Sequence, residues 1–339
     1  MKVLVINCGS SSLKFQLIDM QTEKTLVSGM CDRIGLEGSV LNYKKNGEKF
    51  EKKEAIPDHS KAVSMVLDAL TDKKIGVISS LEEIAAVGHR TVHGGEHFKE
   101  SVLIDENVIK HMEECSALAP LHNPANITGI RACQKLMPNT PMVGVFDTAF
   151  HQTMPPKAFT YGVPYEWYEK HKVRRYGFHG TSHKFVSQRT AEFLGLDYHN
   201  SKIITCHLGN GSSIAAIKNG KCIDTSMGLT PLEGLIMGTR SGDLDPAILE
   251  YIAERENLST KEVVNILNKK SGVLGISGLS SDFRDLLDAD LKGDERAKLA
   301  RAAFAYRVVK YIGSYCAVLI GVDAISFCAG VKMQTSYAV

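Results

Sequence analysis

Two short turns in this sequence combine the residue types that bind phosphate groups. One has the sequence HLGNGSS at residues 207–213 and lies between the apolar runs 203–206 and 214–217. Apolar runs on both sides of a turn of small residues predict a strand, the turn and a second strand. Glycine lets the backbone approach a ligand closely, and backbone amides and serine hydroxyls can donate hydrogen bonds to phosphate oxygens. This stretch therefore predicts a phosphate-binding turn.

The N-terminus repeats this pattern. The apolar run 3–6 leads into NCGSSS at 7–12, and a second apolar run, 13–18, follows. Each turn alone would also suit an ordinary hairpin, but the pair favours a duplicated fold that holds a polyphosphate from two sides. Two better-known phosphate motifs are excluded. The chain has no G-x-x-x-x-G-K-[ST], and the glycines at 209–211 lack both the third glycine and the following helix pattern of a dinucleotide-binding fingerprint.

Five polar side chains near these turns could take part in phosphoryl chemistry. Arg90, in GHRTVHGG, and Arg240, in MGTRSGD, are predicted in glycine-rich loops. A guanidinium there can bind carboxylate or phosphoryl oxygens, although many single arginines only form structural ion pairs. His179 could donate to a phosphoryl oxygen or be a structural histidine. Asp147 ends an apolar strand pattern and could orient an arginine or a metal-bound water, or cap a turn. Asn7 could reach Mg²⁺ through water, because this ion keeps several waters and takes few protein ligands.

Two histidine pairs, His89 with His93 and His179 with His183, have the H-x-x-x-H spacing that binds zinc on a helix. Neither has the glutamate of H-E-x-x-H, and the first pair is predicted at a glycine-rich strand end. A zinc-dependent hydrolase is therefore an alternative that these residues disfavour, and it would need stoichiometric zinc.

Alternating strands and helices must position these residues, which predicts an α/β architecture in both halves of the chain. Buried strands are predicted at 84–87, 142–146 and 322–327, and a charged hairpin at 44–53. Helices are predicted at 59–70 and 105–117, after caps at Asn123, Ser182, Ser259 and Asp282, and at 297–319. Three prolines at 155, 156 and 164 mark a boundary, so the expected domains are 1–150 and 151–339.

The composition limits the class of protein. The chain has 339 residues, 44% of them hydrophobic and 23% charged, which is typical of a soluble globular protein of two domains. A net charge of +2 implies no nucleic-acid partner. Eight cysteines without a C-x-x-C pair indicate reduced thiols in a cytoplasmic protein. We expect no signal peptide and no membrane-spanning segment.

Several long motifs make the chain resemble the acetokinase family of acetate, propionate and butyrate kinases, within the sugar kinase, Hsp70 and actin superfamily. The motifs are NCGSSSLKF (7–15), GHRTVHGG (88–95), LAPLHNP (118–124), VFDTAFHQTMP (145–155), YGFHGTSH (176–183), HLGNGSS (207–213), DTSMGLTPLEGLIMGTRSGDLDP (224–246) and GISGLSSDFRD (275–285). The sixth and seventh resemble acetate kinases more than butyrate kinases. The resemblance implies duplicated actin-like (ribonuclease H-like) ATPase domains with mixed sheets flanked by helices.

The resemblance also implies an activity and residue roles. The implied reaction is reversible, direct in-line transfer from ATP to acetate, giving acetyl phosphate and ADP, with Mg²⁺ or Mn²⁺ and in a homodimer. The implied catalytic residues are Asp147, His179 and Arg240. Arg90 would bind the acyl carboxylate and Asn7 would contact the metal. The implied acyl pocket is lined by Val92, Leu121, Phe178 and Pro231. The implied ATP contacts are Ser10, Ser12, Lys14, His207, Leu208, Gly209, Asn210, Gly211, Asp282, Phe283, Arg284 and Gly330.

The C-terminal segment departs from the family pattern. Gly330 and Val331 fit, but KMQTSYAV at 332–339 does not match the adenosine motif expected there. No Asp or Glu follows Asp323, so the glutamate that the family places near magnesium is missing. A truncation is the simplest interpretation, and it predicts exposed apolar surface on the N-terminal domain. Two alternatives stay open, an inactive nucleotide-binding chain and a propionate or butyrate kinase, because one methylene changes binding by only ~1–3 kcal/mol.

Overall fold

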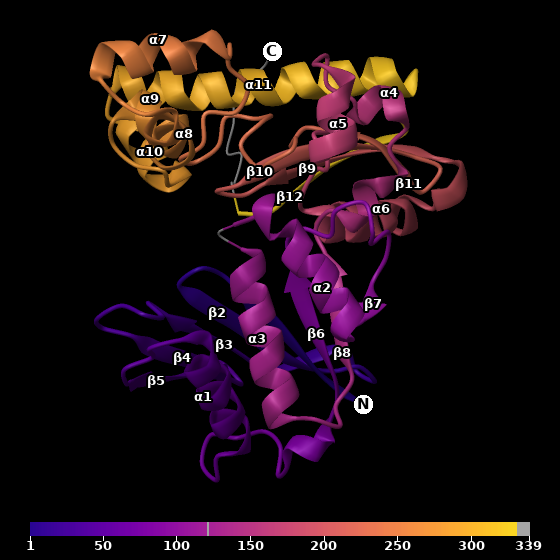
Figure 1. Ribbon diagram of the computed structural model, residues 1–339, viewed down its shortest axis with the longest axis vertical. Coiled ribbons are helices and arrows are strands. Elements are labelled where there is room, and N and C mark those ends of the chain that lie inside the picture. Colours follow the sequence, from indigo (N-terminus) through magenta and orange to yellow (C-terminus); the bar gives the residue numbers. More distant parts are fainter. Residues whose placement is uncertain (121, 331–339) are drawn as a thin grey trace. The chain divides into compact units, whose positions relative to one another are not determined.

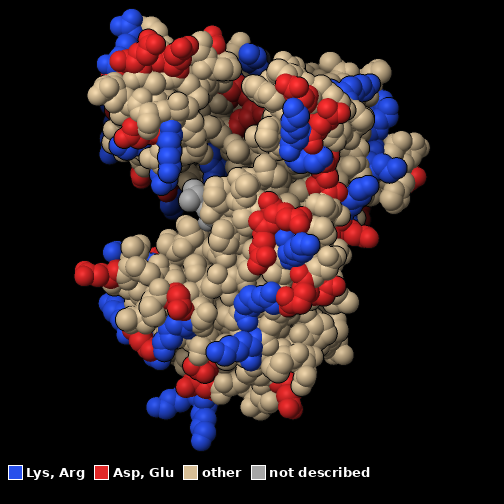
Figure 2. Space-filling view, in the orientation of Figure 1, with Lys and Arg blue, Asp and Glu red and all other residues tan. Residues whose placement is uncertain are grey.

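The structure is a computed structural model that describes residues 1–120 and 122–330. Two compact units make up the chain, Met1–Ala149 and Phe150–Val339. No helix among the described residues is long and apolar enough to cross a membrane. Acidic and basic side chains are interspersed over the face shown in Figure 2, in keeping with the small net charge.

The first unit is built on a mixed eight-stranded sheet (Figure 1). Its strands are β1 (Lys2–Cys8), β2 (Ser12–Asp19), β3 (Lys24–Asp32), β4 (Val40–Lys45), β5 (Glu48–Lys53), β6 (Ile84–Thr91), β7 (Val102–Leu103) and β8 (Met142–Phe146). They lie in the order β5-β4-β3-β2-β1-β6-β8-β7. Strands β1 to β5 pair antiparallel, whereas β6 is parallel to both β1 and β8. The predicted charged hairpin is confirmed as β4 and β5, with Asn46 and Gly47 both at positive φ as a type I′ turn requires.

Helices α1 (His59–Thr71) and α3 (Asn123–Leu136) pack on one face of this sheet (Figure 1). Helix α1 begins after Asp58, whose carboxylate accepts from the Lys61 amide at 2.8 Å. Its apolar residues recur at helical spacing and enter the core with those of the sheet. This core includes Leu4, Ile6, Leu17, Val63, Val66, Leu70 and Ile84. Helix α2 (Glu106–Glu114) packs against α3, and the short turns are η1 (Leu81–Glu83) and η2 (Cys115–Ala117).

The second unit repeats the strand arrangement of the first. Its strands are β9 (Lys202–Leu208), β10 (Ser212–Lys218), β11 (Lys221–Thr225) and β12 (Ala324–Cys328), in the order β11-β10-β9-β12. Strands β9, β10 and β11 pair antiparallel, and β12 is parallel to β9. The first unit contains the same arrangement. Its strands β1, β2 and β3 pair antiparallel, and β6 is parallel to β1. The predicted duplication is therefore confirmed, and each unit has a glycine-containing turn between its first two strands.

The second sheet is covered on both faces. Ile204, Cys206 and Leu208 pack in one cluster with residues of α11 (Glu295–Leu319). Ile203 lies in another cluster, with Ala191 of α6 (Gly180–Leu194). Because successive side chains of a strand point to opposite faces, cover on both faces explains why six of the seven residues of β10 are buried.

Further helices complete the second unit. They are α4 (Pro156–Phe159), α5 (Tyr165–His171), α7 (Ala247–Glu256), α8 (Thr260–Lys269), α9 (Gly272–Ser277) and α10 (Phe283–Leu291), with the turns η3 (Ala149–Thr153) and η4 (Tyr198–Asn200). The predicted caps of α8 and α10 are confirmed. Ser259 and Glu262 form a capping box, and the Asp282 side chain accepts from the Arg284 amide.

Four local predictions are wrong. Arg90 is in β6 rather than a loop, because β1 and β8 supply backbone partners on both sides as far as this residue. Asn123 is the first residue of α3 and not its cap. Ser182 lies inside the first turn of α6, where His179 holds the cap position. The last strand is not buried, because β12 is an edge strand and Phe327 is 55% exposed.

Candidate active site

In the first unit, three parallel strands bring Asn7, Arg90 and Asp147 together. Asn7 in β1 is the register partner of Arg90 in β6, and Asp147 directly follows β8. The Arg90 guanidinium donates from Nε to Asp147 Oδ1 at 3.0 Å and from Nη2 to Asp147 Oδ2 at 2.6 Å. Its Nη1 donates to Asn7 Oδ1 at 3.2 Å. Residues predicted from three separate motifs thus form one hydrogen-bonded group at the carboxyl ends of neighbouring strands.

This group is a bidentate ion pair that can still bind an anion. The Asp147 side chain is 4% exposed and that of Arg90 is 40% exposed. The carboxylate is therefore enclosed while the guanidinium reaches solvent. The negative charge of Asp147 raises the pKa of Arg90. The three hydrogen bonds use three of the five guanidinium N–H hydrogens, so two can donate to a carboxylate or phosphoryl oxygen.

Two asparagines of α3 hold the segment that follows β6. Asn126 accepts from the Val92 amide at 3.2 Å and donates to the Cys8 carbonyl at 2.7 Å. Asn123 accepts from the His93 amide at 3.1 Å and donates to the His93 carbonyl at 3.0 Å. No local sequence pattern indicates these roles directly. The available signal was the presence of two amide side chains on a helix, which need hydrogen-bond partners when they are buried.

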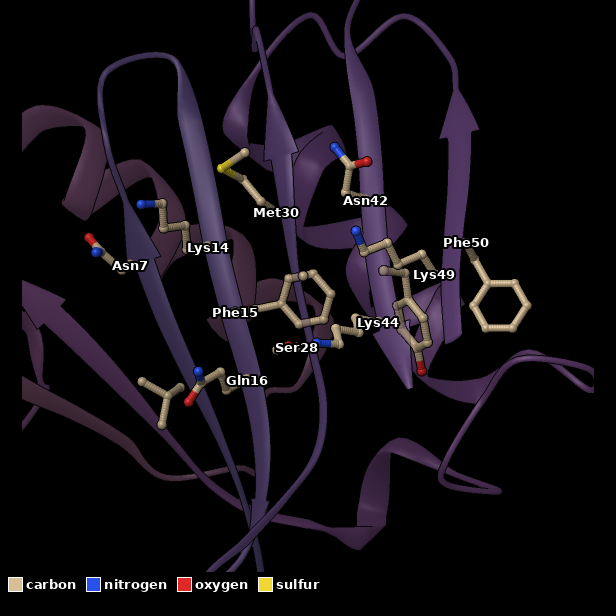
Figure 3. A pocket seen from close by; sticks show the side chains of 13 residues that line it. Asn7, Lys14, Phe15, Gln16, Ser28, Met30, Asn42, Lys44, Lys49 and Phe50 are labelled. Atoms are coloured by element: carbon tan, nitrogen blue, oxygen red, sulfur yellow. The ribbon is translucent and has the colours of Figure 1, made fainter. Parts of the chain in front are cut away.

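The first glycine turn lies at the end of the same strands. The Gly9 amide donates to the Ser12 carbonyl at 2.7 Å, which closes the turn between β1 and β2. Lys14 is the register partner of Asn7, and their side chains lie next to each other in Figure 3. They lie at the edge of a hollow of about 600 Å³ on the sheet. Its lining includes half-buried Val5, Met30 and Phe50 together with Asn42, Lys44 and Lys49.

In the second unit, the turn at 209–211 lies against two predicted catalytic side chains. The Ser212 hydroxyl donates to the Gly209 carbonyl at 2.7 Å, which closes the turn. A Cβ atom at Gly211 would lie 3.3 Å from Arg240 Nη1 and 3.7 Å from His179 Nε2. The guanidinium and the imidazole therefore converge beside this glycine, and they form a second group of predicted residues with the turn.

Arg240 is a half-buried cation with no described carboxylate within 4.0 Å. Its Nη1 donates to the Pro231 carbonyl at 3.4 Å and lies 3.9 Å from the Met237 sulfur, and neither partner is charged. Burial away from water lowers the pKa of Arg240. Arginine nevertheless stays protonated in proteins, and burying an uncompensated charge costs free energy. Arg240 is therefore the strongest indication of an anion site in this unit.

A chain of hydrogen bonds fixes the His179 imidazole. His179 Nδ1 is 2.9 Å from Ser213 Oγ, which is 2.7 Å from His183 Nε2. His183 Nδ1 is 2.6 Å from Thr205 Oγ1. Burial holds the pKa of His183 well below its ordinary value of 6.5, so this imidazole is neutral and donates at one nitrogen only. If Thr205 donates to His183, then His183 donates to Ser213 and Ser213 donates to His179. His179 then carries its proton on Nε2, the nitrogen beside Gly211.

His179 is held in an unusual backbone conformation at the start of α6. Its φ of 58° lies in the left-handed region, which costs free energy for a residue with a side chain. The His207 ring stacks on that of His179 with centroids 4.3 Å apart, and His207 Nδ1 is 2.8 Å from the Ser182 hydroxyl. Phe178 is buried, and its carbonyl lies 2.9 Å from His151 Nε2. These contacts hold the imidazole of His179 in place.

Two other predicted ATP contacts lie near the second turn. Gly330 follows β12, in which Cys328 is the register partner of His207. A Cβ atom at Gly209 would lie 3.7 Å from Ala329 Cβ, so the segment just after β12 runs beside the turn. Leu208 is buried at the end of β9, where it belongs to the core of the sheet.

The predicted residues at 282–284 are not joined to the turn by any described hydrogen bond. Asp282 and Arg284 pair with each other through Nη2 at 2.6 Å, and this contact lowers the pKa of Asp282 to about 2. Phe283 packs edge-on against Phe304, with ring centroids 4.6 Å apart. The predicted pocket residue Leu121 lies outside the described residues.

The histidines of the two H-x-x-x-H pairs contact protein groups. His89 Nε2 lies 3.4 Å from the Met142 sulfur, and His93 Nδ1 accepts from the Gly95 amide at 3.1 Å. Burial lowers the pKa of both imidazoles to about 4. The second pair belongs to the hydrogen-bond chain around Ser213. These contacts fit structural and positioning roles.

Sequence comparison identifies relatives of this chain. The model of the acetokinase family matches residues 2–338. The acetate kinase of Helicobacter hepaticus is 77% identical over 338 residues, which cover 99% of this chain and 84% of that protein. The acetate kinase of Thermotoga maritima is 61% identical over 332 residues, which cover 98% of this chain and 82% of that protein.

Solved structures agree with the sequence comparison. The acetate kinase of Porphyromonas gingivalis superposes with a TM-score of 0.93 at 54% identity, covering 96% of this chain and 82% of that chain. A propionate kinase from Francisella tularensis gives a TM-score of 0.92 at 46% identity, covering 98% and 85%. These likenesses extend over nearly the whole chain and confirm the predicted fold. The chain therefore belongs to the acetokinase family.

Proposed function

We propose that this chain transfers the γ-phosphoryl group of ATP to acetate, forming acetyl phosphate and ADP, and catalyses the reverse reaction. Its relation to acetate kinases at 77% and 61% identity supports this substrate. The enzyme is a phosphotransferase with a carboxyl group as the acceptor. Propionate is the second candidate acceptor, because a protein of 46% identity and closely similar fold is described as a propionate kinase.

The enzyme needs no general base to activate the acceptor. Acetate is already ionised at pH 7, since carboxylic acids titrate near pH ~4–5. Catalysis then consists of positioning the reactants and neutralising charge on the transferring group. We assign Arg90 to the acyl carboxylate and Asp147 to the orientation of Arg90. The bidentate contact between their side chains supports this division of roles.

The observation that carries the proposal is Arg240 beside the turn at 209–211, a cation with no described carboxylate within 4.0 Å. Its guanidinium and the Nε2 atom of His179 approach the same glycine, Gly211. Two donors and a backbone turn at one point suit the oxygens of a phosphoryl group, on which negative charge is spread during transfer. With Thr205 as the donor to His183, the hydrogen-bond chain through Ser213 gives a His179 that donates from Nε2.

Magnesium fits the donor atoms of the first unit. Asn7 Oδ1 and the Asp147 carboxylate are hard oxygen donors held at the same guanidinium. Mg²⁺ binds such oxygens, usually with several waters and with substrate phosphates, and Mn²⁺ accepts the same donor type. We propose that Asn7 helps to hold the ion, which would reduce the negative charge of the ATP phosphates. Arg90, which Asn7 also contacts, keeps its role toward acetate.

The remaining assignments follow the family resemblance. We propose that each unit acts as one actin-like domain, with the division at 150/151. The proposed ATP contacts are Ser10, Ser12, Lys14, His207, Leu208, Gly209, Asn210, Gly211, Asp282, Phe283, Arg284 and Gly330. The proposed acyl-pocket residues are Val92, Leu121, Phe178 and Pro231. We further propose a cytoplasmic homodimer; the eight free cysteines, all within the described residues, support a reducing compartment.

Steady-state release of ADP tests the proposal. The purified chain is incubated with Mg-ATP and with acetate, propionate or butyrate, and ADP is followed with pyruvate kinase and lactate dehydrogenase. We expect acid-dependent ADP release with the highest kcat/KM for acetate. Equal ADP release with and without a carboxylic acid would indicate a simple ATPase, and a preference for propionate would make the second candidate the function.

A further inference from the structure

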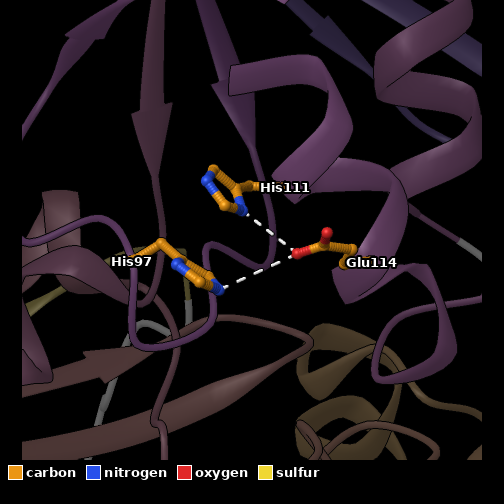
Figure 4. A group of neighbouring side chains, drawn as sticks. All are labelled: His97, His111 and Glu114. Carbon is orange, nitrogen blue, oxygen red and sulfur yellow. Dashed lines mark hydrogen bonds and ion pairs between the residues drawn. The ribbon is translucent and has the colours of Figure 1, made fainter. Parts of the chain in front are cut away.

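We propose that His97, His111 and Glu114 form a binding site for a transition-metal ion of the zinc type on the first unit. Their ligand atoms all lie within 4.8 Å of one another. His111 Nδ1 is 3.0 Å from Glu114 Oε2, and His97 Nε2 is 4.0 Å from the same oxygen. Figure 4 shows both imidazoles directed toward this carboxylate. None of the three residues belongs to the groups assigned to phosphoryl transfer.

The spacing is close to that of a tetrahedral zinc site. Zinc binds histidine nitrogen and carboxylate oxygen at roughly 2.0–2.2 Å, which separates neighbouring ligand atoms by about 3.3 Å. The observed separations of 3.0 and 4.0 Å lie on either side of this value. Because the two rings are stacked, coordination of one ion by both imidazoles requires them to turn toward each other, with a water as the fourth ligand. Two imidazoles and one carboxylate favour Zn²⁺ or its neighbours over Mg²⁺, which prefers oxygen.

The secondary structure places the three ligands side by side. His111 and Glu114 are three residues apart in α2 and so lie on the same face of the helix. The His97 ring stacks on that of His111, with centroids 4.1 Å apart and planes 20° from parallel.

The segment that supplies His97 is anchored on both sides of this residue. Phe98 stacks on Phe146 in a buried cluster, with centroids 4.3 Å apart and planes 9° from parallel. On the other side, a Cβ atom at Gly95 would lie 2.8 Å from Cys115 Sγ, so the backbone there packs closely on the end of α2. A ligand held by packed neighbours loses little freedom on binding metal. An ion at this site would therefore join the segment 92–101 to α2.

Zinc binding to the intact chain tests the proposal. Isothermal titration with Zn²⁺ is carried out in the presence of saturating Mg²⁺, which occupies sites that prefer oxygen ligands. We expect one equivalent of Zn²⁺ to bind, with at least tenfold weaker binding in each of His97→Ala, His111→Ala and Glu114→Gln. His171→Ala removes an exposed histidine of α5 and should leave the affinity unchanged. A parallel titration with Co²⁺ should give visible absorption bands that the three site variants lose.

Two results would overturn the proposal. One is that the wild type binds Zn²⁺ with the same affinity and the same number of equivalents as the triple variant, in which His97→Ala, His111→Ala and Glu114→Gln are combined. The other is an equal loss of affinity in His171→Ala. Melting curves recorded without metal check that the variants are folded. The melting temperature of the wild type should rise with free Zn²⁺, because an ion that binds only the folded state stabilises it, and this rise should be absent from the folded triple variant.

Discussion

Replacement of Asp147 by asparagine tests the division of roles between Asp147 and Arg90. The carboxylate accepts two hydrogen bonds from Arg90, at 3.0 and 2.6 Å, and is almost fully enclosed. Asparagine has nearly the same shape but only one acceptor oxygen, and its NH₂ group would face a guanidinium N–H. We therefore expect Asp147→Asn to leave Arg90 present but poorly oriented.

The size of the effect follows from the lost contact. A hydrogen bond to a charged group contributes about 1.5–3 kcal/mol. The 40% exposure of Arg90 argues for the lower half of this range, because solvent screens the pair. A loss of about 2 kcal/mol in the transition state corresponds to a roughly 30-fold lower kcat. Because no group that takes a proton in the reaction has been removed, the pH profile should keep its shape.

The assay is kcat and KM for acetate between pH 6 and 9, for wild type and Asp147→Asn. Recovery of the rate at high pH in the variant would refute the reasoning, since it would indicate that Asp147 accepts a proton. Glu106→Gln is the matched control. It removes a carboxylate that also pairs with two guanidinium nitrogens, those of Arg131, but both side chains are exposed and the pair is on the surface. We expect less than a twofold change in kcat there.

Three further predictions concern the second unit and acid stability. Arg240→Ala should lower kcat by about 10²–10³-fold without lowering the free energy of unfolding in urea, because it removes a half-buried cation that has no described carboxylate partner; a clear loss of stability would contradict this. Ser213→Ala should lower kcat roughly tenfold, since the Nδ1 partner of His179 is worth about 1.4 kcal/mol, and nitrogen NMR should show a changed His179 tautomer; an unchanged tautomer and kcat would argue against the hydrogen-bond chain. Burial lowers the pKa of His89 from 6.5 to about 4, so the folded state keeps this imidazole neutral. The free energy of unfolding is therefore unaffected by His89 above pH 6.5, and it decreases by up to roughly 3 kcal/mol as the pH falls toward 4, because the unfolded chain then binds a proton that the folded chain does not. His89→Gln should therefore reduce the fall in melting temperature between pH 6.5 and 4.5, and an equal fall would show that another group is responsible.

Local sequence patterns were sufficient for the elements that carry the candidate site. Asn7 and Asp147 follow apolar runs that become β1 and β8, and the turn at 209–211 joins two runs that become β9 and β10. Side-chain alternation and small-residue turns are properties of a few neighbouring residues, so they can be read from the chain directly. The parallel register that joins Asn7 to Arg90 depends on residues 83 positions apart, and no local pattern contains it.

The positioning residues could not be predicted for the same reason. Asn126 holds Val92 through a contact between residues 34 positions apart, and Ser213 of β10 joins His179 and His183 at the start of α6. The interpretation of Asn123 as a cap followed its general preference for helix ends, but its side chain instead satisfies the backbone of His93. The edge position of β12 likewise depends on the strand order and not on its own apolar residues.

Trapping of the product with hydroxylamine tests the central claim most directly, because it detects the acyl phosphate itself. The purified chain is incubated with Mg-ATP, hydroxylamine and acetate, and in parallel with propionate or butyrate, and with Arg240→Ala in place of the wild type. We predict acetohydroxamate in amounts equal to the ADP released, less product with the longer acids and almost none with the variant. No hydroxamate from any acid, with a folded chain that still binds ATP, would contradict the assignment of phosphoryl transfer to carboxylates.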